Sequence, residues 1–233
     1  MKFAAIVVAA GRGLRFGRPK QLALVADRPL VAWSLAAFGA MAELDDLVIA
    51  TEAEHLETMA ALAAASAPRL RTIVVAGGAT RQESVRNAVA AAPARCTAVF
   101  VHDGARPLVN VGDVRAAMAL TKPGTGVLLA KAVTDTIKVV VPGTSAVVKT
   151  LDRSELWAAQ TPQFGTLADL RRAHDAAAAE RFEATDDAAL LERIGCQVLI
   201  VPASADNFKV TVRGDELLAE AILREREAAL PRG

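Results

Sequence analysis

The sequence predicts an α/β protein in three layers, with a mostly parallel sheet between two layers of helices and one inserted β-hairpin. Short, nearly continuous runs of Val, Ile, Leu and Ala recur along the chain, which is typical of strands covered by helices on both faces. Helical stretches lie between these runs, and this alternation favours parallel connections. The expected strands are residues 3–9, 47–50, 72–75, 98–101, 126–130 and 197–201.

Helix starts are marked by side chains that accept hydrogen bonds from the first free backbone N–H groups. Thr51 and Thr80 are each followed three residues later by Glu, which fits a capping box. Asn110 precedes another helical run. Thr185 is followed by two aspartates, and acids in a first turn suit the positive end of a helix dipole. Gly195 is expected to end that helix.

One segment interrupts the alternation of strands and helices. Residues 135–141 and 146–151 are strand-like, and a Pro-Gly-Thr-Ser turn at 142–145 joins them, which predicts a β-hairpin. An isolated two-stranded hairpin is marginal in water, so we expect it to pack on another body such as a second subunit. No repeat or linker divides the chain. We therefore expect one domain over residues 1–233, with residues 135–152 as an inserted arm.

Composition excludes several classes of protein. The chain has 233 residues, with 27 Lys and Arg against 26 Asp and Glu, a balance that argues against a nucleic-acid binder. Its two cysteines, Cys96 and Cys196, cannot build a disulfide framework and are expected to be small, partly buried side chains. No apolar run reaches the roughly 18 residues of a membrane span. A strand at residue 3 leaves no place for a signal peptide, so we expect a cytoplasmic protein.

The sharpest local signal is the loop after the first strand, where residues 9–21 read AAGRGLRFGRPKQ. Glycines allow the backbone to approach a ligand closely, and exposed N–H groups of such a loop bind phosphate oxygens. The spacing fits neither the Walker A loop nor the dinucleotide fingerprint, whose third glycine would fall at Phe16. The loop carries four cations, which predicts a polyanionic ligand: Arg12, Arg15, Arg18 and Lys20.

Asp103 comes directly after a buried strand and is therefore expected at the carboxyl edge of the sheet, where open α/β sheets bind ligands. A carboxylate there suits Mg²⁺, which prefers one or two carboxylates plus substrate phosphates; capping of the next turn is the structural alternative. The histidines show no triad order and no zinc spacing. We expect His102 to be structural, and His55 and His174 to lie on the surface.

The glycine-rich loop and several later blocks, taken in order, resemble the 2-C-methyl-D-erythritol 4-phosphate cytidylyltransferase family. The blocks are GGxxRxxSV at 77–85, HDGARP at 102–107, DTIK at 135–138 and DNFKVT at 206–211, completed by Arg153, by Thr161-Pro162-Gln163 and by Thr185-Asp186. The resemblance spans nearly the whole chain. It implies a Rossmann-like nucleotidyltransferase fold and the transfer of a cytidylyl group from CTP to 2-C-methyl-D-erythritol 4-phosphate, with release of pyrophosphate.

The resemblance also implies roles for individual residues. Cations that hold the triphosphate and stabilise the growing charge would be Arg15, Lys20 and Lys209. The nucleotide would be bound by Ala9, Ala10, Gly11, Gly13, Gly77, Gly78, Arg81, Ser84 and Asp103, with Ser84 at the cytosine edge. The polyol phosphate would be bound by Arg106, Thr136, Arg153 and Thr185. Mg²⁺ would be held by Asp103 and, as a weaker candidate, Asp206.

The family further implies a homodimer in which residues 135–152 form the dimerisation arm, so that one subunit completes the active site of the other. Two alternatives remain open from sequence. A ribitol-5-phosphate cytidylyltransferase would perform the same chemistry on a longer polyol phosphate, although residues 105–107 lean towards the methylerythritol enzyme. A non-catalytic nucleotide-binding module is favoured by the stretch between Arg15 and Lys20, which is shorter than is usual in the family.

Overall fold

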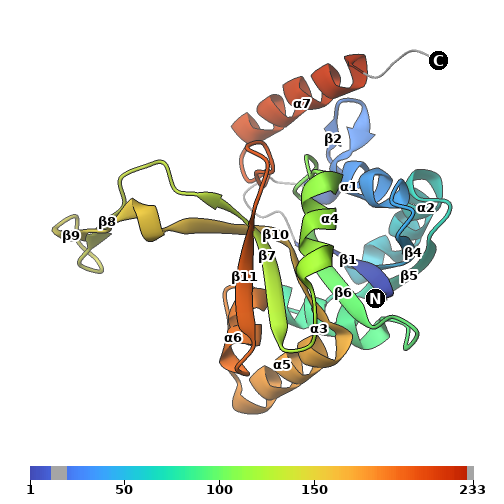
Figure 1. The fold of residues 1–233 in the computed structure, drawn as a ribbon. Coiled ribbons are helices and arrows are strands. Elements are labelled where there is room, and N and C mark those ends of the chain that lie inside the picture. The colour runs from blue at the N-terminus through green and yellow to red at the C-terminus, as the bar shows by residue number, and fades with distance from the viewer. Residues whose placement is uncertain (12–19, 230–233) are drawn as a thin grey trace.

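The computed structural model describes residues 1–11 and 20–229. Within these residues, seven strands form one sheet in the order β11-β7-β10-β6-β1-β4-β5, with helices on both faces (Figure 1). Every pairing in this sheet is parallel except the two made by β10. The strands are β1 (Phe3–Ala9), β4 (Leu44–Thr51), β5 (Arg71–Ala76), β6 (Ala98–Asp103), β7 (Thr125–Ala132), β10 (Trp157–Thr166) and β11 (Gln197–Pro202). The predicted α/β architecture is confirmed.

The two faces of the sheet carry separate cores because successive side chains of a strand point to opposite sides. Phe3, Ala5 and Val7 of β1 pack with one set of helices, and Ala4 and Ile6 pack with the other. The first set is α1 (Leu30–Gly39), α2 (Leu56–Ser66) and α4 (Val111–Leu120). The second set is α3 (Arg81–Ala91), α5 (Leu167–Glu180) and α6 (Asp187–Arg193). Both faces of the central strands are therefore dry, which explains their continuous apolar runs.

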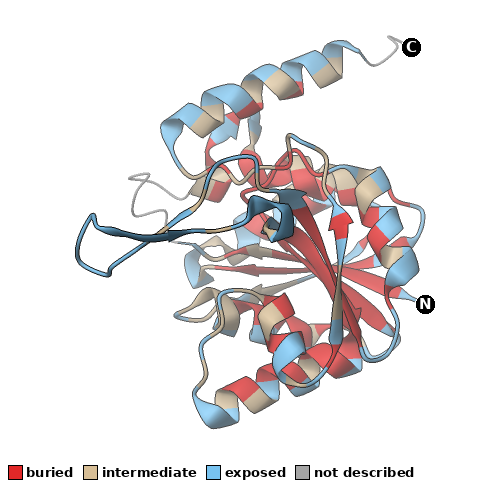
Figure 2. Cartoon of the chain, turned by 60° about the vertical axis from the view of Figure 1, so that its left-hand side comes forward, coloured by how far each residue is buried: buried red, intermediate tan, exposed pale blue. Residues whose placement is uncertain are grey.

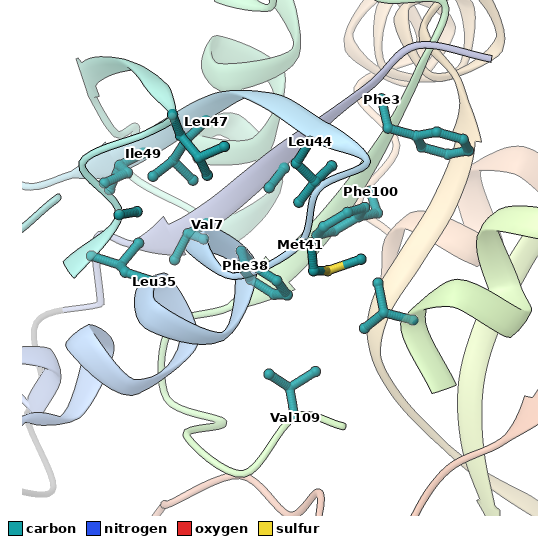
Figure 3. Close-up of a cluster of buried hydrophobic side chains, with 14 of the residues drawn as sticks. Phe3, Val7, Leu35, Phe38, Met41, Leu44, Leu47, Ile49, Phe100 and Val109 are labelled. Atoms are coloured by element: carbon teal, nitrogen blue, oxygen red, sulfur yellow. The ribbon is translucent and has the colours of Figure 1, made fainter. Parts of the chain in front are cut away.

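Figure 3 shows the first of these cores, where Phe38 of α1 meets Phe100 of β6 with ring centroids 5.0 Å apart in an edge-to-face contact. A third, smaller core lies between the start of α1 and α7 (Arg213–Ala228), where Leu30 and Leu223 are buried. Two-residue strands β2 (Leu24–Val25) and β3 (Arg28–Pro29) form a short hairpin beside it. Among the described residues, no helix is both long and apolar enough to cross a bilayer.

Strand β10 is absent from the predicted set, and it runs antiparallel to both of its neighbours in the main sheet. Its sequence, WAAQTPQFGT, contains Gln, Thr, Pro and Gly instead of an apolar run. Its buried part includes Thr161 and Gln163. The pairing with β7 shifts between Ala159 and Gln163, so Pro162 stands where the ladder is interrupted and no N–H is needed.

The helix starts are partly as predicted. The Thr80 hydroxyl accepts from the N–H of Glu83, and Asn110 caps α4 by accepting from two backbone N–H groups. The cap predicted at Thr51 is wrong, because β4 continues through Thr51 and a short 3-10 helix, η2 (Ala53–His55), precedes α2. The N-cap of α6 is Asp186, and Gly195 adopts the left-handed conformation just beyond that helix.

The arm forms a hairpin, as predicted, from β8 (Lys138–Val140) and β9 (Val147–Thr150). It projects away from the sheet (Figure 1), and almost all of it is exposed (Figure 2). Val140, Val141, Val147 and Val148 are between 43% and 60% exposed, so the arm presents an apolar surface that the rest of the described chain leaves open. Another short 3-10 helix, η3 (Arg153–Glu155), leads back into β10.

Candidate active site

The carboxyl ends of β1, β4 and β6 meet at one edge of the sheet. Ala9 is aligned with Thr51 of β4, and Val8 is aligned with Asp103 of β6. The segment after β5 joins this edge, because the N–H of Gly77 donates to the carbonyl of Thr51 over 2.7 Å. Three of the blocks found in the sequence are thereby brought to the position where open α/β sheets bind ligands.

Asp103 lies at the centre of this edge and is surrounded by three cations. Its Oδ1 lies 2.9 Å from Nε of Arg81, and its Oδ2 lies 2.9 Å from Nζ of Lys209 and 3.9 Å from Nε of Arg106. Burial alone would raise the pKa of Asp103, but the charges of Arg81 and Lys209 hold it well below its usual range. The carboxyl group is therefore ionised at neutral pH and balanced by an excess of positive charge.

The segment that carries Lys209 is anchored by buried hydrogen bonds. Arg106 Nη1 donates to the carbonyl of Asn207 over 2.9 Å, and the Asn207 amide donates to Gln160 Oε1 and to the carbonyl of Thr161, each over 3.0 Å. Arg106 and Asn207 are buried. These bonds join two blocks that are far apart in the chain. They fix the backbone beside Lys209, whose side chain is 38% exposed and faces Asp103.

His102 lies beneath this cluster and is fully buried. Its Nε2 lies 3.2 Å from the hydroxyl of Ser34 and 3.1 Å from the carbonyl of Arg106, and its Nδ1 lies 3.2 Å from the hydroxyl of Thr161. That hydroxyl also accepts from the backbone N–H of Asp103. Burial lowers the pKa of His102 to about 4. The ring is neutral and joins strands β6 and β10 to helix α1, as expected of a structural histidine.

The Gly77-Gly78 segment is pressed against the end of β1. A Cβ added at Gly77 would lie 2.4 Å from Cβ of Ala10 and 2.8 Å from Oγ of Ser84, so only glycine fits there. Ser84 Oγ accepts from the N–H of Gly78 and donates to the carbonyl of Thr80. The hydroxyl thus shapes its own loop. Its predicted contact with cytosine stays a prediction.

A sequence model of the 2-C-methyl-D-erythritol 4-phosphate cytidylyltransferase family matches residues 3–225. The chain belongs to this family. A relative of that name from Synechococcus sp. (strain WH7803) is 41% identical over 225 residues, covering 95% of this chain and 99% of its own. Another, from Gloeobacter violaceus, is 39% identical over 94% of this chain and 95% of its own.

Solved structures of the 2-C-methyl-D-erythritol 4-phosphate cytidylyltransferase family agree with the fold. The enzyme from Thermus thermophilus is 33% identical and covers 94% of this chain and 98% of its own, with a TM-score of 0.75. The enzyme from Francisella tularensis is 29% identical and covers 95% of this chain and 99% of its own, with a TM-score of 0.78.

Some residues that the family resemblance selects lie apart from Asp103 or are not described. Arg15 and Gly13 fall outside the described residues, whereas Lys20 begins the 3-10 helix η1 (Lys20–Leu22). Thr136 belongs to the exposed arm, and the exposed Arg153 directly follows the arm, where its Nη1 donates to the carbonyl of Thr134 over 2.7 Å. The exposed Thr185 lies just before α6.

Asp206 is held by a cation of its own. Its Oδ2 lies 2.6 Å from Nη2 of Arg226 on α7, and that guanidinium also donates to the carbonyl of Leu108. Like Asp103, Asp206 is thus paired with a cation in the described residues. The expectation that Asp206 serves as a second metal ligand stays a prediction.

Two side chains behind the site were not selected from sequence. Asp187 is buried and its Oδ2 lies 3.0 Å from Nη1 of Arg81. His174, predicted to lie on the surface, is instead 1% exposed and faces Asp187. The prediction was wrong because it weighed the polar residues of α5 above their spacing. The buried residues Leu170, Ala173, His174 and Ala177 follow the i, i+3, i+4, i+7 pattern of an inward face.

Proposed function

We propose that the chain transfers the cytidylyl group of CTP to 2-C-methyl-D-erythritol 4-phosphate. An oxygen of the polyol phosphate forms a bond to the α-phosphorus of CTP, the bond from that phosphorus to the bridging oxygen breaks, and pyrophosphate leaves. Family membership over almost the whole chain supports this activity. The observation that carries it is the ionised Asp103 among Arg81, Arg106 and Lys209 at the carboxyl edge.

The main task in this reaction is to bring two anions together. Phosphoryl-type transfer leaves little covalent work for the protein, so positioning and charge stabilisation dominate. Lys209 would stabilise the charge that develops at the α-phosphate, since its side chain is partly exposed and its ammonium group is held beside Asp103 at the edge of the sheet. Arg15 and Lys20 would hold the triphosphate, together with backbone N–H groups at Ala9, Ala10 and Gly11.

The donors at the edge fit one Mg²⁺ bound through a single carboxylate. Asp103 is ionised and would share the ion with the phosphates of CTP, which is the coordination that Mg²⁺ prefers. When bound, the ion would neutralise phosphate charge and orient the α-phosphate. Oδ2 of Asp103 is paired with Lys209, so Lys209 would move from the carboxylate to a phosphate oxygen as CTP and Mg²⁺ arrive.

The second substrate would be bound in part by the arm of a partner subunit. Arg106 stands beside Asp103, whereas Thr136 lies on the arm and Arg153 directly follows it. An arginine fork suits a phosphate. The exposed valines of the arm would pack on the partner, and this packing would bring Arg153 to the site of the other subunit. Thr185 completes the proposed set.

The function is tested by measuring pyrophosphate release with Mg²⁺ and CTP, using 2-C-methyl-D-erythritol 4-phosphate and, in parallel, ribitol 5-phosphate. We expect turnover with the first acceptor and little with the second. Turnover with ribitol 5-phosphate alone would move the chain to the sister activity. Binding of CTP and Mg²⁺ without turnover of either acceptor would contradict the proposal in favour of a non-catalytic module.

A further inference from the structure

His174 and Asp187 form a buried pair that the proposed reaction leaves without a role. His174 lies on α5 and Asp187 begins α6, and their side chains are 1% and 2% exposed. Nε2 of His174 lies 3.3 Å from Oδ1 of Asp187. Burying an ionised carboxylate is costly unless it is paired with opposite charge or hydrogen-bonded. A buried aspartate at this place therefore needs a compensating partner besides the contact with His174, whose ring nitrogens form no hydrogen bond with the described residues.

The other partner of Asp187 is Arg81, which also holds Asp103. Nη1 of Arg81 lies 3.0 Å from Oδ2 of Asp187, while its Nε lies 2.9 Å from Oδ1 of Asp103. Burial alone would lower the pKa of Arg81, but the charges of Asp187 and Asp103 raise it above its ordinary value. Four side chains thus form a continuous path from α5, through α6 and α3, to the end of β6.

The path divides the donors of Arg81 between two carboxylates. A guanidinium and a carboxylate prefer to meet through two parallel hydrogen bonds. Between Arg81 and Asp103 a single bond forms, from Nε to Oδ1, while Nη1 donates to Asp187, so the two carboxylates hold the guanidinium from different sides. Oδ2 of Asp103 is directed to Lys209, at a distance of 2.9 Å.

We propose that Asp187 and His174 are positioning residues for cytidylyl transfer. Asp187 fixes the guanidinium of Arg81, and Arg81 in turn fixes Asp103 with one oxygen left for the metal and for Lys209. His174 packs against the second oxygen of Asp187 and keeps that carboxylate from turning. The inference rests on the proposed function, since the orientation of Asp103 matters to turnover only if Asp103 takes part in it.

The direct test is the Asp187→Asn variant, compared with a surface Asp–Arg pair that joins the neighbouring helix α5 to α3. Losing a partner that orients a metal ligand typically costs about 10- to 100-fold in metal affinity or activity. We expect kcat to fall within that range, and Mn²⁺ binding in the presence of CTP, followed by electron paramagnetic resonance, to weaken similarly. The KM of the polyol phosphate is expected to be unchanged. Asp175→Asn is the control, because Asp175 pairs with Arg86 across α5 and α3 at the surface, 3.3 Å apart.

A second pair of variants tests His174 and covers the case in which Asp187→Asn does not fold. His174→Gln keeps an N–H near the position of Nε2, whereas His174→Leu removes it. We expect Gln to retain most of the kcat and of the Mn²⁺ affinity, and Leu to lose several-fold of each. Equal values for the two variants would overturn the role of His174.

The failure of this inference is separable from that of the proposed function. A folded Asp187→Asn protein with wild-type kcat and Mn²⁺ affinity would overturn the positioning role while the enzyme itself remains active. If the wild-type protein does not convert CTP and 2-C-methyl-D-erythritol 4-phosphate, the proposed function is wrong. The Mn²⁺ measurement with CTP then still tests the orientation of Asp103, and unchanged Mn²⁺ affinity in the variant would again overturn it.

Discussion

The edge around Asp103 and the arm at residues 135–152, which Arg153 directly follows, carry residues proposed for the same reaction but are built in opposite ways. Around Asp103, charged groups are buried, paired and fixed by backbone bonds from several elements. Next to the arm, Arg153 is exposed and donates to the carbonyl of Thr134, and the valines of the arm are exposed. The first region is preorganised within one chain, whereas the second is proposed to act only when it packs on a partner subunit.

The difference shows what stabilises the conformation of each region. Charge stabilisation in catalysis is most effective when the charged groups are fixed before the substrate arrives. The charged groups around Asp103 are already fixed within one chain, without a partner subunit. The arm buries too little to hold its own geometry, because a two-stranded hairpin is marginal in water. Its proposed role in phosphate binding is therefore expected to depend on dimer formation.

The largest expected effect comes from the preorganised edge. Lys209→Ala is expected to lower kcat by about 100- to 1,000-fold, which is the usual cost of removing one group that stabilises developing charge. Thermal unfolding should change little, because Lys209 is 38% exposed. Lys122→Ala, at an exposed lysine outside the site, is the control. A Lys209→Ala enzyme with near wild-type kcat would remove Lys209 from the mechanism.

The arm is expected to show a different kinetic signature. Arg153→Ala should raise the KM of the polyol phosphate by roughly 10- to 100-fold, since a charged hydrogen bond contributes about 1.5–3 kcal/mol. The KM of CTP should remain unchanged. Steady-state kinetics with each substrate varied in turn gives both values. Equal weakening of the two substrates would contradict the assignment of Arg153 to the polyol phosphate.

We expect the arm, but not the edge around Asp103, to require dimer formation, and we expect the exposed surface of the arm to control that dimerisation. Val147→Asp with Val148→Asp places two charges on the exposed apolar strand β9, so we expect light scattering to find monomers at micromolar concentration. Specific activity should fall several-fold while CTP binding persists. Leu120→Asp, at an exposed position ending α4, is the control. Fully active monomers would show that the arm is not needed.

The smallest expected effect concerns how the free energy of unfolding depends on pH. The pKa of His102 is lowered to about 4 by burial, against about 6.5 in an unfolded chain. Below pH 6.5 the unfolded chain binds a proton that the folded protein does not, so stability falls as pH falls. Between pH 7 and pH 5 we expect a loss of about 2 kcal/mol from this group. Urea unfolding at both pH values should show a smaller difference in His102→Gln; an equal difference would contradict the buried neutral state.

The parts of the fold that the sequence predicts are those in which the chemistry is local. Strands β1, β4 and β6 are apolar runs because both of their faces are covered. Strand β10 has no such run, since its buried part includes polar side chains that bond to neighbouring segments. Only the assembled sheet shows that it is a strand.

The candidate site likewise combines features that the sequence predicts with features that only the assembled fold reveals. Asp103 could be placed at the carboxyl edge from the strand before it, but its pairing with Lys209 joins residues 106 positions apart and follows only from the assembled fold. Ser84 was selected for its hydroxyl, yet that hydroxyl is bonded within its own loop. His174 was misplaced because its inward direction depends on the face of α5 that meets the sheet.

The most direct test of a site shared between two subunits is a heterodimer of Lys209→Ala and Arg153→Ala chains, purified through two different tags and assayed at low polyol phosphate. If the arm of one subunit completes the site of the other, one of the two sites holds both an intact Lys209 and an intact Arg153. We predict recovery of about half of the wild-type activity, although each homodimer is nearly inactive. If each arm served its own subunit, both sites would keep one defect, and a heterodimer as inactive as its parents would contradict the account.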